Sequence, residues 1–186
     1  MVLLQPEEKV YYCEMKGSRF LFCDERVKMH LLHLMDELHQ MENWRILAFC
    51  IMDDCAYFMI ETARKYENEG LVRFIKEAVR EKLAGAFYEA GLKKSDLFLT
   101  AYTLQLRVWP EIMDRCIKIH QIPLESGKSR RLEDYWWSSY LYYARLHDWE
   151  MVDRSFLLRY LSADQREAGK RFMQMHKQID SEVCEI

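Results

Sequence analysis

Two short apolar runs, "WRILAFCIM" and "CAYFMIE", meet at a pair of aspartates, and this arrangement most constrains how the chain can fold. Both runs are rich in β-branched and aromatic residues, which is typical of strands. Only Asp53 and Asp54 separate them, and so short a connection predicts a β-hairpin. The glycine that such turns usually contain is missing here.

Helical periodicity appears on both sides of this hairpin. Residues 24–41 carry apolar residues at helical spacing, and Asp24 is suited to cap that helix at its N-terminus. Residues 70–91 show the clearest helical stripe of the chain, and Gly91 is suited to end it. Pro110 is expected to open a third helix that runs to about Ile119.

Two further segments alternate in the manner of strands, residues 10–15 and residues 96–108. The element order is then strand, helix, hairpin, helix, strand, helix, followed by a helical tail. This order predicts an α+β fold of ferredoxin-like type, an antiparallel sheet with helices on one face plus a C-terminal helical extension. We expect the main domain over residues 1–145 and the extension, packed on the same domain, over residues 146–186.

Composition narrows the class of protein. A chain of 186 residues, half of them hydrophobic and 31% charged, suits one folded domain. Its apolar runs are shorter than the roughly 18–20 residues that span a bilayer, and its first residues do not form a signal peptide. The six cysteines form no CxxC pair, which favours reduced thiols, and we expect a soluble, cytoplasmic protein without a membrane partner. The net charge of -3 excludes a global basic field but leaves room for a local basic patch.

Four segments resemble the single-tyrosine (HUH-type) transposases, in particular their REP-associated, insertion-sequence-200-like branch. The segments are "YYCEMKGSRFLF", "AFCIMDDCAYFMIET", "GLVRFIKEAVREKLAGAF" and "IKIHQIPLESG" with the trailing "LEDYWWSSYLYY". Together they span the chain up to about Leu161, and the last of them is the most specific. The resemblance implies the ferredoxin-like fold, DNA as partner and a homodimer.

The resemblance also implies a chemistry, and this chain departs from it. In the family, two histidines on the hairpin hold a divalent cation, and a tyrosine on the following helix attacks the DNA phosphate. Cys55 and Tyr57 stand where those histidines are expected, and Lys118 stands where the tyrosine is expected. His120 and Pro123 match the family pattern. These differences predict a degenerate member of the family that neither cleaves DNA strands nor needs a cofactor. Magnesium or manganese is expected only if the site is still active.

Alternatives remain open for these positions. Cys55 and Tyr57 can form a packed strand face, or they can keep a residual metal site together with Asp54 or His120. His120 can instead be a structural, hydrogen-bonded histidine. The later aromatic cluster contains four tyrosines: Tyr135, Tyr140, Tyr142 and Tyr143. These side chains can have a packing role, or one of them can act as a substitute nucleophile.

Two groups of basic residues are candidates for DNA contact. Lys128, Arg130 and Arg131 precede the aromatic cluster, so cations for phosphate and rings for base stacking occur close together. Arg73 and Lys76 add positive charge to the helix of residues 70–91, although interspersed glutamates also fit a solvated mixed-charge face.

The resulting functional prediction is a DNA-binding protein of transposase ancestry that recognises hairpin or single-stranded DNA without cleaving it. Two alternatives stand beside it. One is an active transposase or nuclease with a rewired metal site. The other is a protein-interaction module that no longer binds DNA.

Overall fold

A computed structural model describes residues 9–17, 21–63, 66–91, 99–145 and 151–183. Four strands form one antiparallel sheet in the order β2-β3-β1-β4. Their bounds are Lys9–Gly17 for β1, Arg45–Ile51 for β2, Cys55–Thr62 for β3 and Leu99–Leu106 for β4. This order, with one helix after β1 and one after β3, is the predicted ferredoxin-like arrangement.

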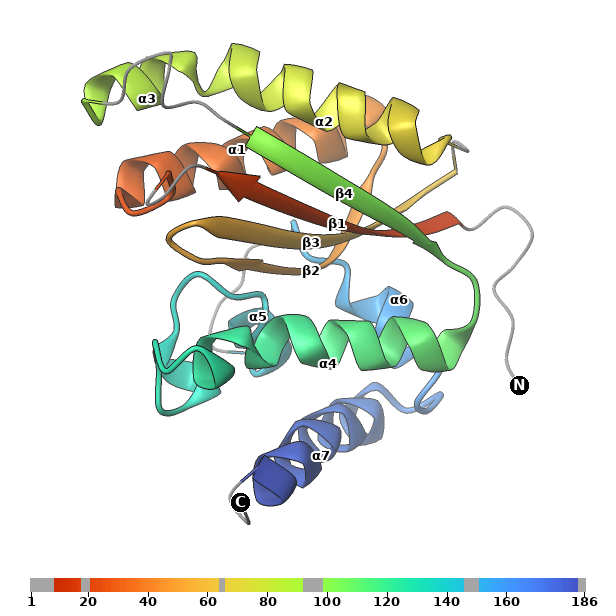
Figure 1. Ribbon diagram of the computed structural model, residues 1–186. Coiled ribbons are helices and arrows are strands. Elements are labelled where there is room, and N and C mark those ends of the chain that lie inside the picture. Colours follow the sequence, from red (N-terminus) through yellow and green to blue (C-terminus); the bar gives the residue numbers. More distant parts are fainter. Residues whose placement is uncertain (1–8, 18–20, 64–65, 92–98, 146–150, 184–186) are drawn as a thin grey trace.

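Helices cover both faces of the sheet (Figure 1). On one face lie α1, α2 and α3, which span Glu25–Glu42, Asn68–Lys82 and Ala84–Glu89. On the other face lies α4, Trp109–Glu125, and beyond it the later elements, as Figure 1 shows. These are η2 over Leu132–Asp134, α5 over Tyr140–Tyr143, α6 over Arg154–Leu158 and α7 over Gln165–Val183. The predicted fold class is confirmed, and the C-terminal helices add a second helical layer to it. None of the described helices is both long and apolar enough to cross a bilayer.

The predicted hairpin is confirmed, and its turn is closed by backbone contacts in place of a glycine. The Met52 amide donates to the Cys55 carbonyl at 2.7 Å. The carbonyls of Asp53 and Asp54 point outward and accept from the amides of Phe22 and Gly17 at 2.8 and 2.9 Å. The segment after β1 therefore anchors the turn from outside.

Local helix signals were informative but not complete. Asp24 caps α1 as predicted, because its side chain accepts from the Arg26 amide at 2.8 Å. The single helix predicted for residues 70–91 is wrong, since the chain leaves helical geometry at Leu83 and divides into α2 and α3. Gly91 follows with φ +74°, a conformation that suits glycine. The third helix runs beyond the predicted end, through Pro123 to Glu125.

The predicted packing role of the aromatic cluster is what the structure shows, and its contacts cover the outer edge of β2. The hydroxyls of Tyr135 and Tyr143 donate to the carbonyls of Ile51 and Leu47, each at 2.8 Å. The Ser139 amide donates to the Phe49 carbonyl at 2.9 Å. An edge strand leaves backbone groups open to pairing with other chains, and here the chain's own C-terminal part occupies them. In the described residues β4, at the opposite edge, pairs with β1 alone.

Candidate functional site

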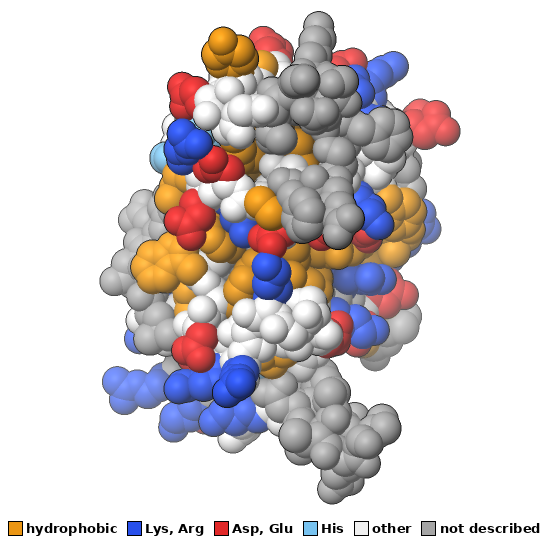
Figure 2. Space-filling view, turned by 60° about the vertical axis from the view of Figure 1, so that its left-hand side comes forward, with side chains coloured by type: hydrophobic (Ala, Val, Ile, Leu, Met, Phe, Trp, Pro, Cys, Tyr) orange, Lys and Arg blue, Asp and Glu red, His pale blue; other side chains and the backbone are white. Residues whose placement is uncertain are grey.

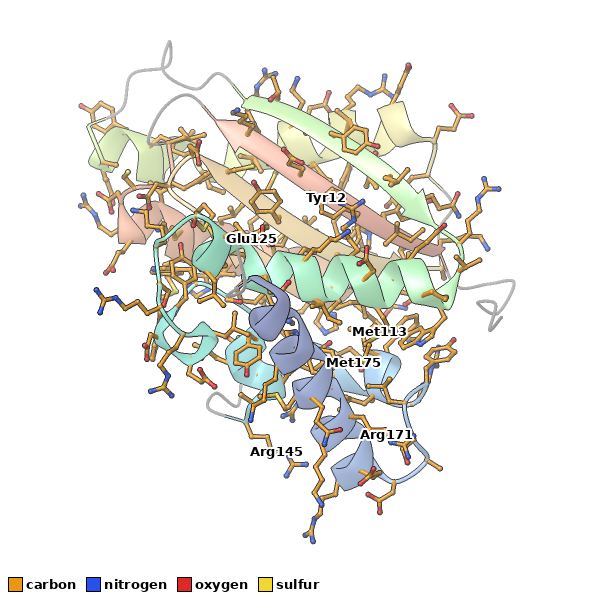
Figure 3. The ribbon with its side chains drawn as sticks, turned by 60° about the horizontal axis from the view of Figure 1, so that its bottom comes forward. Tyr12, Met113, Glu125, Arg145, Arg171 and Met175 are labelled. Atoms are coloured by element: carbon orange, nitrogen blue, oxygen red, sulfur yellow. The ribbon has the colours of Figure 1, made fainter. Side chains whose placement is uncertain are left out.

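The hairpin position singled out by the sequence lies on the sheet face beneath α4. Side chains two apart on a strand share a face, and antiparallel pairing sets Glu14 of β1 opposite Tyr57 of β3. The Tyr12 hydroxyl donates to the Glu14 carboxylate at 3.1 Å, and the Cys55 thiol lies 3.9 Å from the other carboxylate oxygen. From α4, the Arg115 guanidinium lies 4.5 Å from the centre of the Tyr12 ring, and Figure 3 shows Tyr12 on the sheet beside this helix.

Burial raises the pKa values of the thiol and the two phenols of this cluster. Desolvation raises the pKa of the Cys55 thiol to about 11, and it also raises the pKa values of the Tyr12 and Tyr57 phenols. The Glu14 carboxylate adds to the shift in all three cases because a nearby negative charge disfavours a second one. The thiolate is the form that binds metals, and the raised pKa makes the thiolate of Cys55 costlier to form.

The described residues contain no group of three or more His, Cys, Asp and Glu side chains that could hold a metal ion. Of the candidates for the residual metal site, His120 is bound to Ser139 and His176. Cys55 and Tyr57 share a face, as their spacing predicts. The geometry favours the packed strand face over the metal site.

Lys118 occupies an exposed position on α4. Its ammonium pairs with the Asp114 carboxylate one turn earlier at 2.9 Å, and both side chains are more than half exposed. A pair of this kind in water contributes little to stability. Lys118 is thus a solvated surface residue, available to an anion but held by no buried partner.

His120 faces away from the hairpin cluster and belongs to a buried chain of hydrogen bonds. Its Nε2 lies 2.7 Å from the Ser139 hydroxyl, and its Nδ1 lies 2.9 Å from Nε2 of His176 on α7. His176 Nδ1 in turn lies 2.8 Å from the Phe172 carbonyl. Because a carbonyl can only accept, His176 must carry its proton on Nδ1, His120 must donate from Nδ1, and Ser139 must donate to His120. The histidine is structural, and it ties α7 to the body of the protein.

The loop of residues 126–131 carries the first group of predicted DNA contacts. Lys128 pairs with the Asp53 carboxylate, which also holds the buried Lys28 at 3.0 Å, so this lysine fastens the loop to the hairpin turn. Arg130 and Arg131 are exposed and line a cavity of about 480 Å³ together with Lys177 of α7. Figure 2 shows Lys and Arg side chains gathered low on the face that this loop occupies.

An exposed tryptophan follows the same loop. Trp136 is 62% exposed, whereas its neighbour Trp137 is buried and lies under the Lys28 ammonium at 5.7 Å. A large aromatic side chain with this much exposed surface is suited to stack on another flat group. The sequence pointed to the aromatic run as a whole, but only the fold distinguishes the one exposed ring from its packed neighbours.

Arg73 and Lys76 lie elsewhere. They line a groove between α2 and β4 together with Arg80, and Tyr102 of β4 is 54% exposed beside them. The groove also contains Glu69 and Glu77. Since α2 and the loop of residues 126–131 lie on opposite sides of the sheet (Figure 1), the structure does not bring the two predicted groups together.

A third basic surface, which the sequence analysis did not predict, is a cleft lined by four arginines: Arg45, Arg145, Arg154 and Arg159. These residues come from the start of β2, the end of α5 and the α6 region. No run of basic residues marks them in the sequence, so no local signal could have found this cleft.

The comparisons agree with this description at the level of the fold. No family model and no curated protein matches the sequence. The α+β fold is similar to that of a known transposase. A solved structure, that of a REP-associated tyrosine transposase bound to a REP hairpin, matches with a TM-score of 0.56 and 10% sequence identity. The match covers 83% of this chain and 95% of that one. The resemblance predicted from the four sequence segments is therefore confirmed as a similarity of structure.

Proposed function

We propose that this chain is a DNA-binding protein of REP-associated tyrosine transposase ancestry that has lost strand cleavage. The observation that carries the proposal is the shared fold with a transposase bound to a DNA hairpin. DNA, single-stranded or folded as a hairpin, is the partner that this similarity favours.

The proposed loss of cleavage rests on three positions that agree with one another. Cys55 and Tyr57 are packed and protonated where the resemblance expects metal ligands. Lys118 stands where the family pattern has the attacking tyrosine, and an amine cannot form a phosphotyrosine link. We therefore expect neither a divalent metal nor a covalent DNA intermediate.

The loop of residues 126–131 and Trp136 are the proposed DNA contact. The exposed guanidinium groups of Arg130 and Arg131 can neutralise phosphates, and the ring of Trp136 can stack on a base. Lys128 contributes less to DNA binding in this proposal because its ammonium is already paired with Asp53.

A homodimer is also proposed, and it is expected to form away from β2, whose edge the chain's own C-terminal part covers. The outer edge of β4 is the position that a second chain could extend. Light scattering coupled to gel filtration would measure the mass, and a monomer at micromolar concentration would contradict the dimer.

Fluorescence anisotropy with a labelled single-stranded hairpin, measured between low and moderate salt, tests DNA binding. Each phosphate contact on single-stranded DNA adds about 0.7 to the slope of log affinity against log salt. The double variant Arg130→Gln/Arg131→Gln should lower that slope by about 1.4. The control Arg107→Gln/Arg166→Gln removes the same charge from exposed arginines away from the loop and Trp136, and it should leave the slope unchanged. No binding even at low salt would instead favour a protein-interaction module.

Cleavage is tested separately by incubation with the same hairpin and manganese. We expect no nicked strand and no covalent adduct on a denaturing gel. Specific nicking that disappears in Cys55→Ala or His120→Ala would refute the proposed loss and support the rewired enzyme.

A further inference from the structure

The arginine-lined cleft lies between the ends of elements that are distant in the sequence. Its walls come from the C-terminal end of α1, the start of β2, the end of α5, and the α6 and α7 regions. Its volume is about 640 Å³, within the range of about 300–1,000 Å³ typical of sites for small molecules. It shares no lining residue with the hairpin cluster, the loop of residues 126–131 or the α2–β4 groove.

The charge of this cleft is unbalanced. Its described lining contains four arginines and one carboxylate, that of Asp153. Asp153 accepts from the Phe156 amide at 3.1 Å and from the Ser155 hydroxyl at 2.5 Å, and Glu61 beside the lining pairs with Arg45. Four arginines against these two carboxylates still leave an excess of two positive charges. An excess of cations inside a concave surface raises the local positive potential and attracts anions, although the chain as a whole is acidic.

Three of the arginines are held in place by other groups. Arg45 lies 3.3 Å from the Glu61 carboxylate and 3.9 Å from that of Asp153. Arg154 donates to the Tyr142 carbonyl at 2.9 Å. The Arg159 guanidinium lies over the rings of Phe156 and Tyr160, at 4.4 and 4.8 Å from their centres. Side chains fixed in this way lose little conformational entropy when a ligand binds.

Arg145 completes the cleft and is exposed at its rim (Figure 3). Its backbone has φ 58°, the left-handed conformation, which is uncommon for a residue other than glycine. The turn before it holds that conformation, since the Arg145 amide donates to the Tyr142 carbonyl at 3.2 Å. Arg145 is thus the exposed arginine among the lining residues whose backbone the turn holds in place.

Arginine is the side chain best suited to an oxyanion, because its planar fork forms two parallel hydrogen bonds to one group. A single carboxylate ligand carries one negative charge, whereas a phosphate monoester carries about two and accepts from several donors. Four guanidinium groups around one small cleft match the higher charge and the larger number of acceptors.

We propose that this cleft binds a phosphate group carried by a ligand of up to nucleotide size. The phosphate belongs either to the end of a nucleic-acid strand or to a free phosphorylated compound. The proposal does not depend on DNA binding at the loop of residues 126–131, since the two surfaces share no residue.

Isothermal titration calorimetry with sodium phosphate at constant ionic strength tests the proposal on the full chain. Saturable binding is expected, and Arg145→Gln/Arg159→Gln should weaken it at least about tenfold, as expected for the loss of two charged hydrogen-bond donors. The control Arg26→Gln/Arg107→Gln and the loop variant Arg130→Gln/Arg131→Gln should bind as the unaltered chain does. Absent binding, or equal affinity in all variants, would overturn the proposal.

A second measurement needs no substitution and so does not depend on how the variants fold. Phenylglyoxal modifies accessible arginines, and peptide mass spectrometry identifies the modified positions. Phosphate should protect Arg145 and Arg159 and leave Arg26 and Arg107 reactive. Protection spread evenly over all four would overturn the proposal.

A pair of short oligonucleotides distinguishes the two sources of phosphate. Preference for a 5′-phosphorylated strand over the same strand with a 5′-hydroxyl, lost in the cleft variant, would assign the site to a strand end. If both strands bind equally and the calorimetry shows that inorganic phosphate binds, the site would be assigned to a free phosphorylated compound. In either case, DNA binding through the loop of residues 126–131 is tested by Arg130→Gln/Arg131→Gln and not by the cleft variant.

Discussion

Acidification is expected to loosen α7 from α4 through the buried pair His120 and His176. Both rings are neutral in the hydrogen-bond chain that ends at the Phe172 carbonyl. A proton added to His176 Nε2 would set two N–H groups against each other across 2.9 Å. Burial lowers the pKa of His176 from 6.5 to about 4, and burial together with the neighbouring ring lowers the pKa of His120 well below its usual value.

The direction of the pH dependence of stability follows from the lowered pKa values of the two histidines. In the unfolded chain both histidines take up a proton near pH 6.5, whereas the folded chain resists protonation until lower pH. Stability is therefore full above pH 6.5 and is lost as the pH falls from 6.5 toward about 4. For His176 alone, the free energy of unfolding at pH 5 should be lower by about 2 kcal/mol than at neutral pH. His120 adds to the loss in the same direction.

Urea unfolding followed by circular dichroism at several pH values between 5 and 7 would measure this dependence. Each histidine contributes a slope of up to about 1.4 kcal/mol per pH unit, and His176→Gln should remove one such contribution. The slope is the useful quantity because a constant loss of stability in the variant does not alter it. An equal slope in His176→Gln and in the unaltered chain would refute the assignment of the effect to this pair.

Three further outcomes are expected. Asp53→Ala should lower the free energy of unfolding by about 1–3 kcal/mol in urea unfolding, because it leaves a buried lysine unpaired, whereas Lys128→Ala should change it by less than about 0.5 kcal/mol. Tyr143→Phe should cost about 1 kcal/mol in the same assay, since it removes the hydroxyl that donates to a β2 carbonyl. Iodoacetamide at pH 7.5 should modify the exposed Cys23 well before Cys55, whose pKa burial raises to about 11, and peptide mapping that finds Cys55 modified first would contradict its buried state.

The fold was largely readable from the sequence because its signals are local. Two apolar runs around Asp53 and Asp54 predict a hairpin whatever the rest of the chain does. Asp24 caps α1 through a backbone amide only two residues away. Where local signals compete, the prediction failed: helical periodicity continues past Leu83, yet the chain breaks there. Helical residues on both sides of a break keep the same periodicity, so the pattern alone does not locate it.

The candidate sites were readable only in part, because their partners are distant in sequence. Lys128 is a predicted DNA contact, and the sequence did not indicate that Asp53, 75 residues earlier, pairs with it. His120 was ambiguous between a ligand and a structural residue until His176, 56 residues later, supplied its partner. A pattern of residue types contains no information about which distant side chain will satisfy a given group.

The sequence by itself determined the antiparallel sheet, the helices that connect its strands and the absence of the expected histidines and tyrosine. These features depend on backbone periodicity and on residue identity, which are properties of short segments. Only the tertiary structure decided which aromatic ring stays exposed, which cations remain available and where four scattered arginines form one cleft. Those outcomes depend on burial and on charge brought together by packing, and packing is set by the whole chain at once.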